Sequence, residues 1–124
     1  MFGTEDLAVL AAPSIAHIVH SSIDQSVGDS LLKMTVRVGA AAYVCQNETV
    51  RARDDLLHIL ATICVPTNVV IGATDMKTPL ACSEELSNGI ANSKLYVTPQ
   101  CGHLPPIERP AVVAELIRNW LRDS

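Results

Sequence analysis

The sequence predicts an α/β chain in which a helical first half precedes a βαβα unit with a small parallel sheet. Its 124 residues suffice for one domain at most. The composition, 48% hydrophobic and 18% charged, is typical of globular proteins and not of disordered ones. The pattern of apolar residues also changes at Pro66, from helical spacing to short β-branched runs. We therefore divide the chain into a helical segment, residues 1–63, and a βαβα part, residues 64–124.

The first half is expected to be helical but irregular. Residues 1–23 show no clear periodicity. Beyond them, apolar positions at helical spacing predict three helices: from a cap at Asp29 or Ser30 to about Val38, Ala40–Val50, and Asp54–Ile63. Gly39 is expected to break the chain between the first two of these helices.

The second half alternates between strand and helix patterns. The predicted elements are a strand at Thr67–Ile71, a helix at Pro79–Gly89, a strand at Leu95–Thr98 and an amphipathic helix at Pro110–Arg122. Two strands joined through a helix pair in parallel, with a right-handed connection. The second half is therefore predicted to form a small parallel sheet.

Charge and hydropathy exclude several classes of partner. The formal net charge is −4 and the basic residues are scattered, so no nucleic-acid partner is expected. The apolar run Leu7–Val19 follows acidic residues and is interrupted by Pro13 and His17. It fits neither a signal peptide, which begins with basic residues, nor a membrane helix of about 20 apolar residues. We therefore expect a cytoplasmic protein without a membrane partner.

No metal or cofactor site is expected from the cysteines and histidines. The cysteines stand singly at positions 45, 64, 82 and 101, without a C-x-x-C pair. We interpret them as reduced, small apolar residues. His17, His20 and His58 do not form a ligand set, because a third ligand is missing where two of them share a helix face.

Two polar side chains follow the predicted strands. Asp75 comes three residues after Gly72, and His103 follows the second strand within Cys101–Leu104. In isolation, such an aspartate more often forms a turn, and such a histidine is more often only solvent-exposed. However, neighbouring strands lie about 4.8 Å apart, so loops at their carboxyl ends can bring the two side chains together. A carboxylate on one imidazole nitrogen leaves the other free to take a proton from a nucleophile.

The motifs around these residues resemble the α/β-hydrolase family. Cys64–Pro79 resembles the segment in which a Pro-led strand reaches G-x-x-D-x-x-T-P. Gly102–Leu104 followed by Glu108–Pro110 resembles that family's G-H-L…E-x-P ending. Further positions resemble the segment that leads from the cap to the core: Met34, Val38-Gly39, Gln46 and Arg51–Asp54. The resemblance spans roughly Pro13 to Ser124.

The resemblance implies a partial α/β-hydrolase fold, in which residues 1–63 are a cap remnant. It makes Asp75 the acid and His103 the histidine of a Ser-Asp-His triad, whose serine lies upstream in G-x-S-x-G. Neither that motif nor the early oxyanion-hole loop occurs in the chain. Asn68 and Pro105-Pro106 also depart from the usual pattern.

We therefore expect a C-terminal fragment, inactive alone, of an enzyme that acts on a small ester-like substrate. One sheet edge would lack its neighbouring strand, which favours self-association or complementation by an N-terminal half.

Two alternatives stay open at the level of sequence. The chain can be a non-catalytic interaction or structural protein derived from the hydrolase fold. It can also be a hydrolase of the GDSL type, because Gly28–Leu31 spells that motif and Asp55-x-x-His58 has a similar acid–base spacing. Against the second alternative, Ile23–Val27 makes a poor strand where that family places one.

Overall fold

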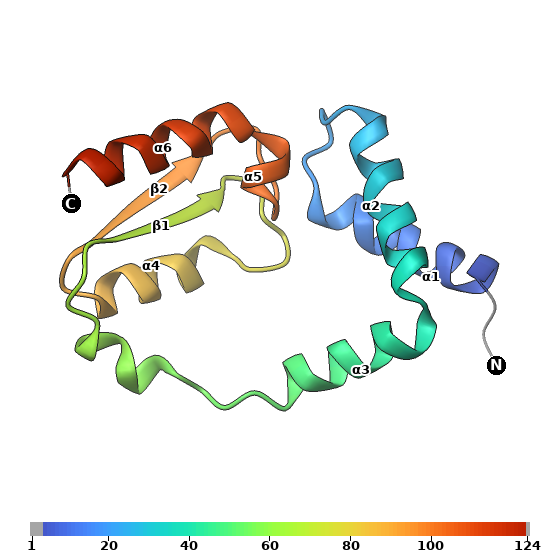
Figure 1. The fold of residues 1–124 in the computed structure, drawn as a ribbon, viewed down its shortest axis with the longest axis horizontal. Coiled ribbons are helices and arrows are strands. Elements are labelled where there is room, and N and C mark those ends of the chain that lie inside the picture. The colour runs from blue at the N-terminus through green and yellow to red at the C-terminus, as the bar shows by residue number, and fades with distance from the viewer. Residues whose placement is uncertain (1–3, 124) are drawn as a thin grey trace.

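The computed structural model describes residues 4–123, and Figure 1 shows the chain arranged in two groups of elements. One group holds the helices α1 (Thr4–Ile18), α2 (Gln25–Val38) and α3 (Ala40–Arg51). A segment with the 3₁₀ helix η1 (Leu57–Thr62) leads to the other group. That group comprises β1 (Thr67–Gly72), α4 (Leu80–Gly89), β2 (Ser93–Thr98), α5 (Pro105–Glu108) and α6 (Pro110–Asp123). The predicted α/β class, helices followed by a βαβα unit, is confirmed.

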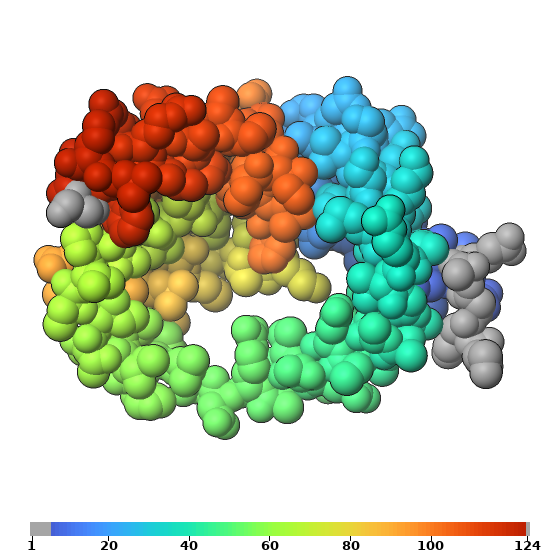
Figure 2. All heavy atoms as spheres, in the orientation of Figure 1, coloured from blue at the N-terminus to red at the C-terminus, as the bar shows by residue number. Residues whose placement is uncertain are grey.

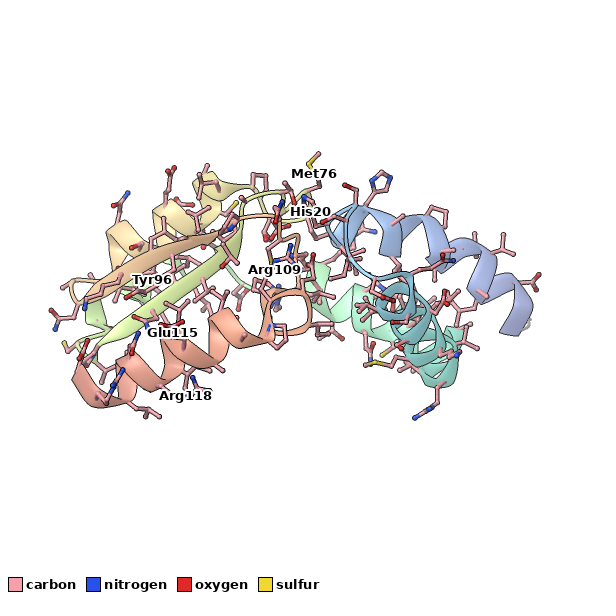
Figure 3. The ribbon with its side chains drawn as sticks, turned by 90° about the horizontal axis from the view of Figure 1, so that it is seen from above. His20, Met76, Tyr96, Arg109, Glu115 and Arg118 are labelled. Carbon is pink, nitrogen blue, oxygen red and sulfur yellow. The ribbon has the colours of Figure 1, made fainter. Side chains whose placement is uncertain are left out.

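The sheet consists of β1 and β2, which pair in parallel from Thr67 opposite Ser93 to Gly72 opposite Thr98. Helix α4 connects the two strands and packs against both. Figures 1 and 3 place α4 and α6 on opposite faces of the sheet. At one end of α6, the Trp120 indole N–H donates a hydrogen bond of 3.1 Å to the carbonyl of Pro66. This bond joins the last turns of α6 to the start of β1.

The end of β1 lies very close to the loop that follows β2. A Cβ atom at Gly72 would lie 2.0 Å from the carbonyl oxygen of Gly102 and 2.3 Å from that of Cys101. Only glycine allows two backbone segments to approach so closely. In η1 and the group of elements that holds the sheet, the most deeply buried apolar side chains are Leu60, Ile71, Ile90 and Cys101. The position of both strand-end loops is therefore set by close backbone packing.

Two expectations for the first half are wrong. Residues 4–18 form α1 although no periodicity was recognised there, and residues 1–3 lie outside the described part of the chain. The signal was present, because the buried Leu7, Ala11 and Ile15 are spaced four apart on one helix face. Helix α2 begins at Gln25, capped by the Asp24 carboxylate, which accepts a bond of 2.8 Å from the Ser26 amide. The expected caps at Asp29 and Ser30 are therefore interior helix positions.

Three further details differ from expectation. The segment Asp54–Ile63 forms only the 3₁₀ helix η1, not a full α-helix. The single turn α5, just before α6, was not predicted. All four cysteines are free, but only Cys101 is buried, so the expectation of apolar packing fails for the others: Cys45, Cys64 and Cys82. By contrast, the predicted break at Gly39 is confirmed, because this residue ends α2 with a positive φ of 84°.

The chain leaves its interior partly unfilled. Figure 2 shows an opening bounded by α3 and η1 on one side and by α4 and the segment after β1 on the other. Many large apolar side chains are also exposed, among them Val65 at 64% and Leu121 at 65%. None of the helices within residues 4–123 is long and apolar enough to span a membrane.

Candidate active site

The carboxyl ends of the two strands bring Asp75 and His103 together. The turn after β1 is fixed to the loop after β2, because the Thr74 amide and hydroxyl both donate to the Cys101 carbonyl oxygen at 2.9 Å. The Ala73 amide also donates to the carbonyl of Thr98, at 2.8 Å. These bonds hold the two loops side by side, as strand-end geometry predicts.

The two side chains are in direct hydrogen-bond contact. Asp75 Oδ2 lies 2.9 Å from His103 Nδ1. The Asp75 side chain is only 4% exposed, whereas that of His103 is 33% exposed. Within residues 4–123, no hydrogen bond engages the other ring nitrogen, Nε2. The arrangement therefore has a shielded carboxylate on one side of the ring and a free nitrogen on the other.

The Asp75 carboxylate is held by its own turn as well as by the histidine. Oδ1 accepts hydrogen bonds from the amides of Lys77 at 2.8 Å and Thr78 at 3.0 Å. Burial raises the pKa of Asp75, but the hydrogen bonds from Thr78, His103 and Lys77 outweigh it and lower the pKa from 3.8 to about 2. The carboxylate is therefore ionised at neutral pH. The ordinary turn-forming role of an aspartate and the contact with histidine coexist here.

Thr78 is a site residue that sequence reasoning did not single out. Its hydroxyl donates to Asp75 Oδ2 at 2.7 Å and lies 3.3 Å from His103 Nδ1. It thus touches both members of the pair. The sequence did contain a signal for this role, because Thr78 is the threonine of the G-x-x-D-x-x-T-P motif.

Glu108 is a second residue whose part in the site was not foreseen. It is 3% exposed, and its carboxylate accepts hydrogen bonds from the amides of Gly102 at 2.9 Å and Leu104 at 3.0 Å, on either side of His103. Beside it, burial and the Glu108 carboxylate raise the pKa of the Cys101 thiol to about 11. Cys101 is therefore a protonated, buried thiol at neutral pH, not a nucleophile.

The residues of the GDSL-type alternative do not meet. The Ser30 hydroxyl donates to the Ser26 carbonyl inside α2, at 2.7 Å. Asp55 Oδ1 accepts from the Leu57 amide at 2.9 Å, and His58 Nδ1 lies 3.1 Å from the Asp55 carbonyl oxygen. No hydrogen bond within residues 4–123 joins Ser30 to either of them.

The side chain of His20, another of the histidines, has a local contact. His20 Nδ1 lies 2.7 Å from the Ser22 hydroxyl. Among residues 4–123, no three His, Cys, Asp or Glu side chains are placed to hold a metal ion.

Comparison with known proteins points to one fold family. No protein-family model matches the chain. Over 71 residues, 57% of this chain, it is 32% identical to monoacylglycerol lipase ABHD6 of Mus musculus. Over 58 residues, 47% of this chain, it is 38% identical to the 2-hydroxymuconate semialdehyde hydrolase of Pseudomonas putida. Each matched segment covers 21% of the relative, so these matches span only a small part of the two enzymes.

Solved structures extend the likeness to nearly the whole chain. A thermophilic esterase from Thermogutta terrifontis superposes with a TM-score of 0.78 at 27% identity, over 96% of this chain and 45% of the esterase. The CarC serine hydrolase of carbazole degradation superposes over 100% of this chain and 49% of its own, with a TM-score of 0.73 and 21% identity. The chain is therefore a partial α/β-hydrolase fold, as its motifs predict, and its relatives are α/β-hydrolases.

Proposed function

We propose that this chain supplies the acid, Asp75, and the histidine, His103, of a Ser-Asp-His triad in a carboxylic-ester hydrolase, and that it is inactive alone. The observation that supports this most is the 2.9 Å contact between the shielded Asp75 carboxylate and His103 Nδ1, with Nε2 left free.

The geometry supports general base catalysis at Nε2. The Asp75 carboxylate holds the neutral ring with its proton on Nδ1, so that Nε2 can accept the proton of a serine hydroxyl as the oxygen attacks the acyl carbon. The imidazolium that forms is stabilised by the same carboxylate. The imidazolium then gives the proton from Nε2 to the departing alkoxide. In the second half of the reaction, a water molecule takes the place of the serine hydroxyl and hydrolyses the acyl-enzyme with the same proton transfers.

The nucleophile must come from elsewhere. No serine in the chain stands in G-x-S-x-G, and no hydroxyl within residues 4–123 is hydrogen-bonded to His103 Nε2. An aligned share of 45% leaves more than half of the Thermogutta terrifontis esterase without a counterpart here. We propose that the serine and the oxyanion hole belong to a polypeptide segment equivalent to that remaining part of the esterase. The similar proteins include a monoacylglycerol lipase and an esterase, which favours a small carboxylic ester as substrate.

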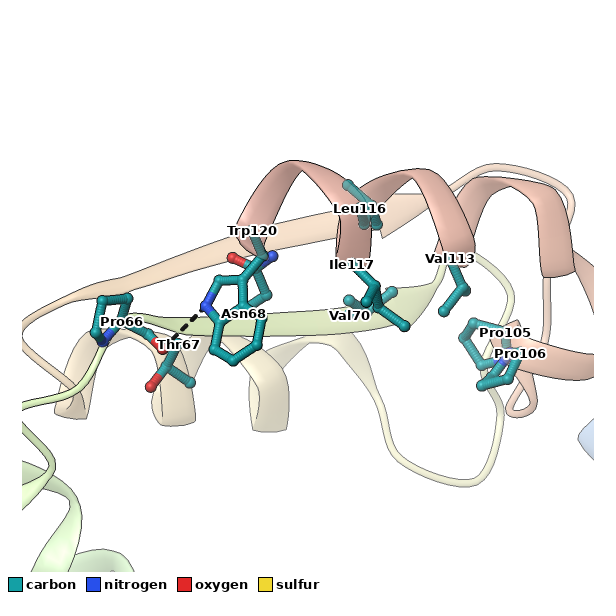
Figure 4. Close-up of a pocket in the computed structure, with 10 residues that line it drawn as sticks. All are labelled: Pro66, Thr67, Asn68, Val70, Pro105, Pro106, Val113, Leu116, Ile117 and Trp120. Carbon is teal, nitrogen blue, oxygen red and sulfur yellow. Dashed lines mark hydrogen bonds between the residues drawn. The ribbon is translucent and has the colours of Figure 1, made fainter. Parts of the chain in front are cut away.

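The proposal includes a partner at the free edge of β1. Within residues 4–123, only β2 pairs with β1, and an apolar groove of about 520 Å³ lies between β1 and α6. Figure 4 shows Val70 of β1 and Ile117 of α6 along this groove, with Pro105 and Pro106 at one end. An unpaired aliphatic edge recruits another strand. We propose that this edge pairs with the N-terminal half of the fold and that, without it, copies of the chain associate.

Association through the groove is tested by sedimentation velocity over a range of concentrations. Ile117, which lines the groove, is 50% exposed, whereas Val112 on the same helix is 40% exposed and does not line it. Ile117→Lys should shift the chain toward monomer, and Val112→Lys should not. A wild-type chain that stays monomeric at high concentration would contradict this part of the proposal.

The catalytic part is tested by a graft. This chain replaces the matching segment of the Thermogutta terrifontis esterase, so that the esterase supplies the nucleophile. Hydrolysis of a p-nitrophenyl ester should fall by about 10³-fold or more in His103→Ala. His17→Ala, an exposed histidine of α1, is the matched control and should leave the rate unchanged. An active graft that is indifferent to His103→Ala would refute the proposal.

The isolated chain is the complementary test. We expect no turnover of the same ester above that of the His103→Ala variant. Turnover that this variant abolishes would show that the chain is an enzyme by itself. Labelling of Ser30 by a fluorophosphonate probe would instead favour the GDSL-type alternative.

A further inference from the structure

We propose that Glu108 is a positioning residue that clamps the end of α1 to the loop of His103 and thereby sets the imidazole against Asp75. This inference deepens the proposed function and rests on it for its catalytic meaning. The clamp itself is a structural claim, and it can be tested without a nucleophile.

The carboxylate of Glu108 gathers amides from two distant parts of the chain. Oε2 accepts from the His20 amide at 2.7 Å and from the Gly102 amide at 2.9 Å, and Oε1 accepts from the Leu104 amide at 3.0 Å. His20 lies 88 residues from Glu108 and belongs to the loop between α1 and α2. Figure 3 shows His20 at the junction between the helices of the first half and the strand-end loops.

The burial of the Glu108 carboxylate increases the energetic importance of these three hydrogen bonds. Glu108 is 3% exposed, so its charge is shielded from water and depends on the three amide donors. A backbone N–H group can only donate, which matches a carboxylate with two accepting oxygens. Such a charge is tolerated only while the donors stay in place. The clamp therefore fixes the backbone immediately before and after His103.

A second set of contacts joins the same segments. The His103 amide donates to the Ile18 carbonyl oxygen at 2.6 Å. A Cβ atom at Gly102 would lie 2.6 Å from that oxygen and 2.9 Å from the His20 nitrogen, so the two backbones are in direct contact. The end of α1 thus lies against the histidine loop, and the Glu108 carboxylate bonds to the His20 amide on one side and to the Gly102 and Leu104 amides on the other. Movement of the first-half helices would be transmitted to the imidazole through this joint.

The role differs from ordinary helix capping. Glu108 is the last residue of the single turn α5, and its bond to the Leu104 amide alone would cap that turn. The bonds to Gly102 and His20 reach outside α5 and have no capping purpose. The positioning role of Glu108 is inferred from these two bonds.

The test uses NMR on the isolated, ¹⁵N-labelled chain with the variants Glu108→Gln and Glu108→Ala. The glutamine can keep one accepting oxygen for the His20 and Gly102 amides, but its NH₂ group would face the Leu104 amide, donor against donor. The alanine loses all three bonds. Glu115→Gln, an exposed glutamate on α6, is the matched control.

Two readouts separate positioning from general stability. The first is the downfield Nδ1 proton of His103, which reports its hydrogen bond to Asp75. The second is amide hydrogen exchange at Gly102 and His20, which should become roughly tenfold faster or more when a bond to a charged acceptor is lost. We expect Glu108→Ala to lose the Nδ1 signal and Glu108→Gln to retain a weakened one, while the amide signals of β1 and β2 stay native-like.

An unchanged Nδ1 proton in both variants would overturn the proposal, as would identical losses in the Glu115→Gln control. If Glu108→Ala unfolds, Glu108→Gln carries the test, because it preserves size and one accepting oxygen. A positive result here, together with a graft indifferent to His103→Ala, would uphold the clamp and refute the proposed function. The two failures are therefore distinguishable.

Discussion

Replacing Asp75 by asparagine should make the stability of the chain less dependent on acid pH. Asparagine keeps the shape of the side chain and one accepting oxygen, but it removes the charge that four hydrogen bonds converge on. Those bonds come from the amides of Lys77 and Thr78, the Thr78 hydroxyl and the His103 ring. The loss falls on the folded state alone, because the unfolded chain has no such arrangement.

The size of the effect follows from the pKa of Asp75, which is lowered from 3.8 to about 2 in the folded chain. At about 1.36 kcal/mol per pKa unit, this corresponds to at most about 2.5 kcal/mol of stability at neutral pH. Water around the exposed neighbours in the turn screens part of this, so we expect about 1–2 kcal/mol. Because the folded pKa is lowered, the contribution is complete above the unfolded pKa of 3.8 and is lost as the pH falls through about 2.

Urea unfolding of the wild type and Asp75→Asn at pH 7, 3 and 2 measures this directly. The difference in the free energy of unfolding should be about 1–2 kcal/mol at pH 7, about half of that at pH 3, and small at pH 2. Asp54→Asn, an exposed aspartate before η1, is the control and should match the wild type throughout. A difference that stays constant or grows toward pH 2 would refute the reasoning.

Four other substitutions test the packing and bonding of the site and sheet. Gly102→Ala should lower the melting temperature, by a loss of about 1–3 kcal/mol, because its Cβ would meet the Ile18 carbonyl oxygen at 2.6 Å. Gly28→Ala, with nothing within 4 Å inside α2, should instead raise stability by about 0.5–1 kcal/mol, and equal losses would contradict this contrast. Thr78→Val should raise the pKa of Asp75 above its present value of about 2 in an NMR titration, because the hydroxyl bond to Oδ2 is lost, and an unmoved pKa would show that this bond is immaterial. Trp120→Phe should reduce the free energy of unfolding in urea by about 0.5–1.5 kcal/mol, since the bond to the Pro66 carbonyl disappears, and an unchanged midpoint would count against that bond.

The second half of the chain was predictable because its local signals agree with one another. Pro66 and Gly72 bracket the β-branched run of β1, and Pro79 directly precedes α4. The strand-end rule then placed Asp75 and His103 at the same edge of the sheet, where the structure has them in contact. Their catalytic roles, the division at residue 63 and the cytoplasmic location stay predictions.

The first half was less predictable because its helices pack on few neighbours. Among residues 6–18 of α1, only a narrow stripe is buried, and no residue of α2 or α3 is buried, so the hydrophobic pattern of these helices is weak. The part played by Glu108 also escaped sequence reasoning. All three of its partners, the amides of His20, Gly102 and Leu104, are backbone groups outside α5, and backbone amides leave no trace in the sequence. The only sequence signal for Glu108 was its place as the glutamate of the G-H-L…E-x-P motif.

The central claim, that Asp75 acts through His103 in ester hydrolysis, is tested most directly by a double-mutant cycle in the esterase graft. Asp75→Asn, His103→Ala and the double variant are compared by their kcat/KM for a p-nitrophenyl ester. If the pair works as one unit, the double variant should be no slower than His103→Ala alone, because the carboxylate has nothing to orient once the imidazole is gone. Losses that multiply in the double variant would show that the two residues act independently and would contradict the account.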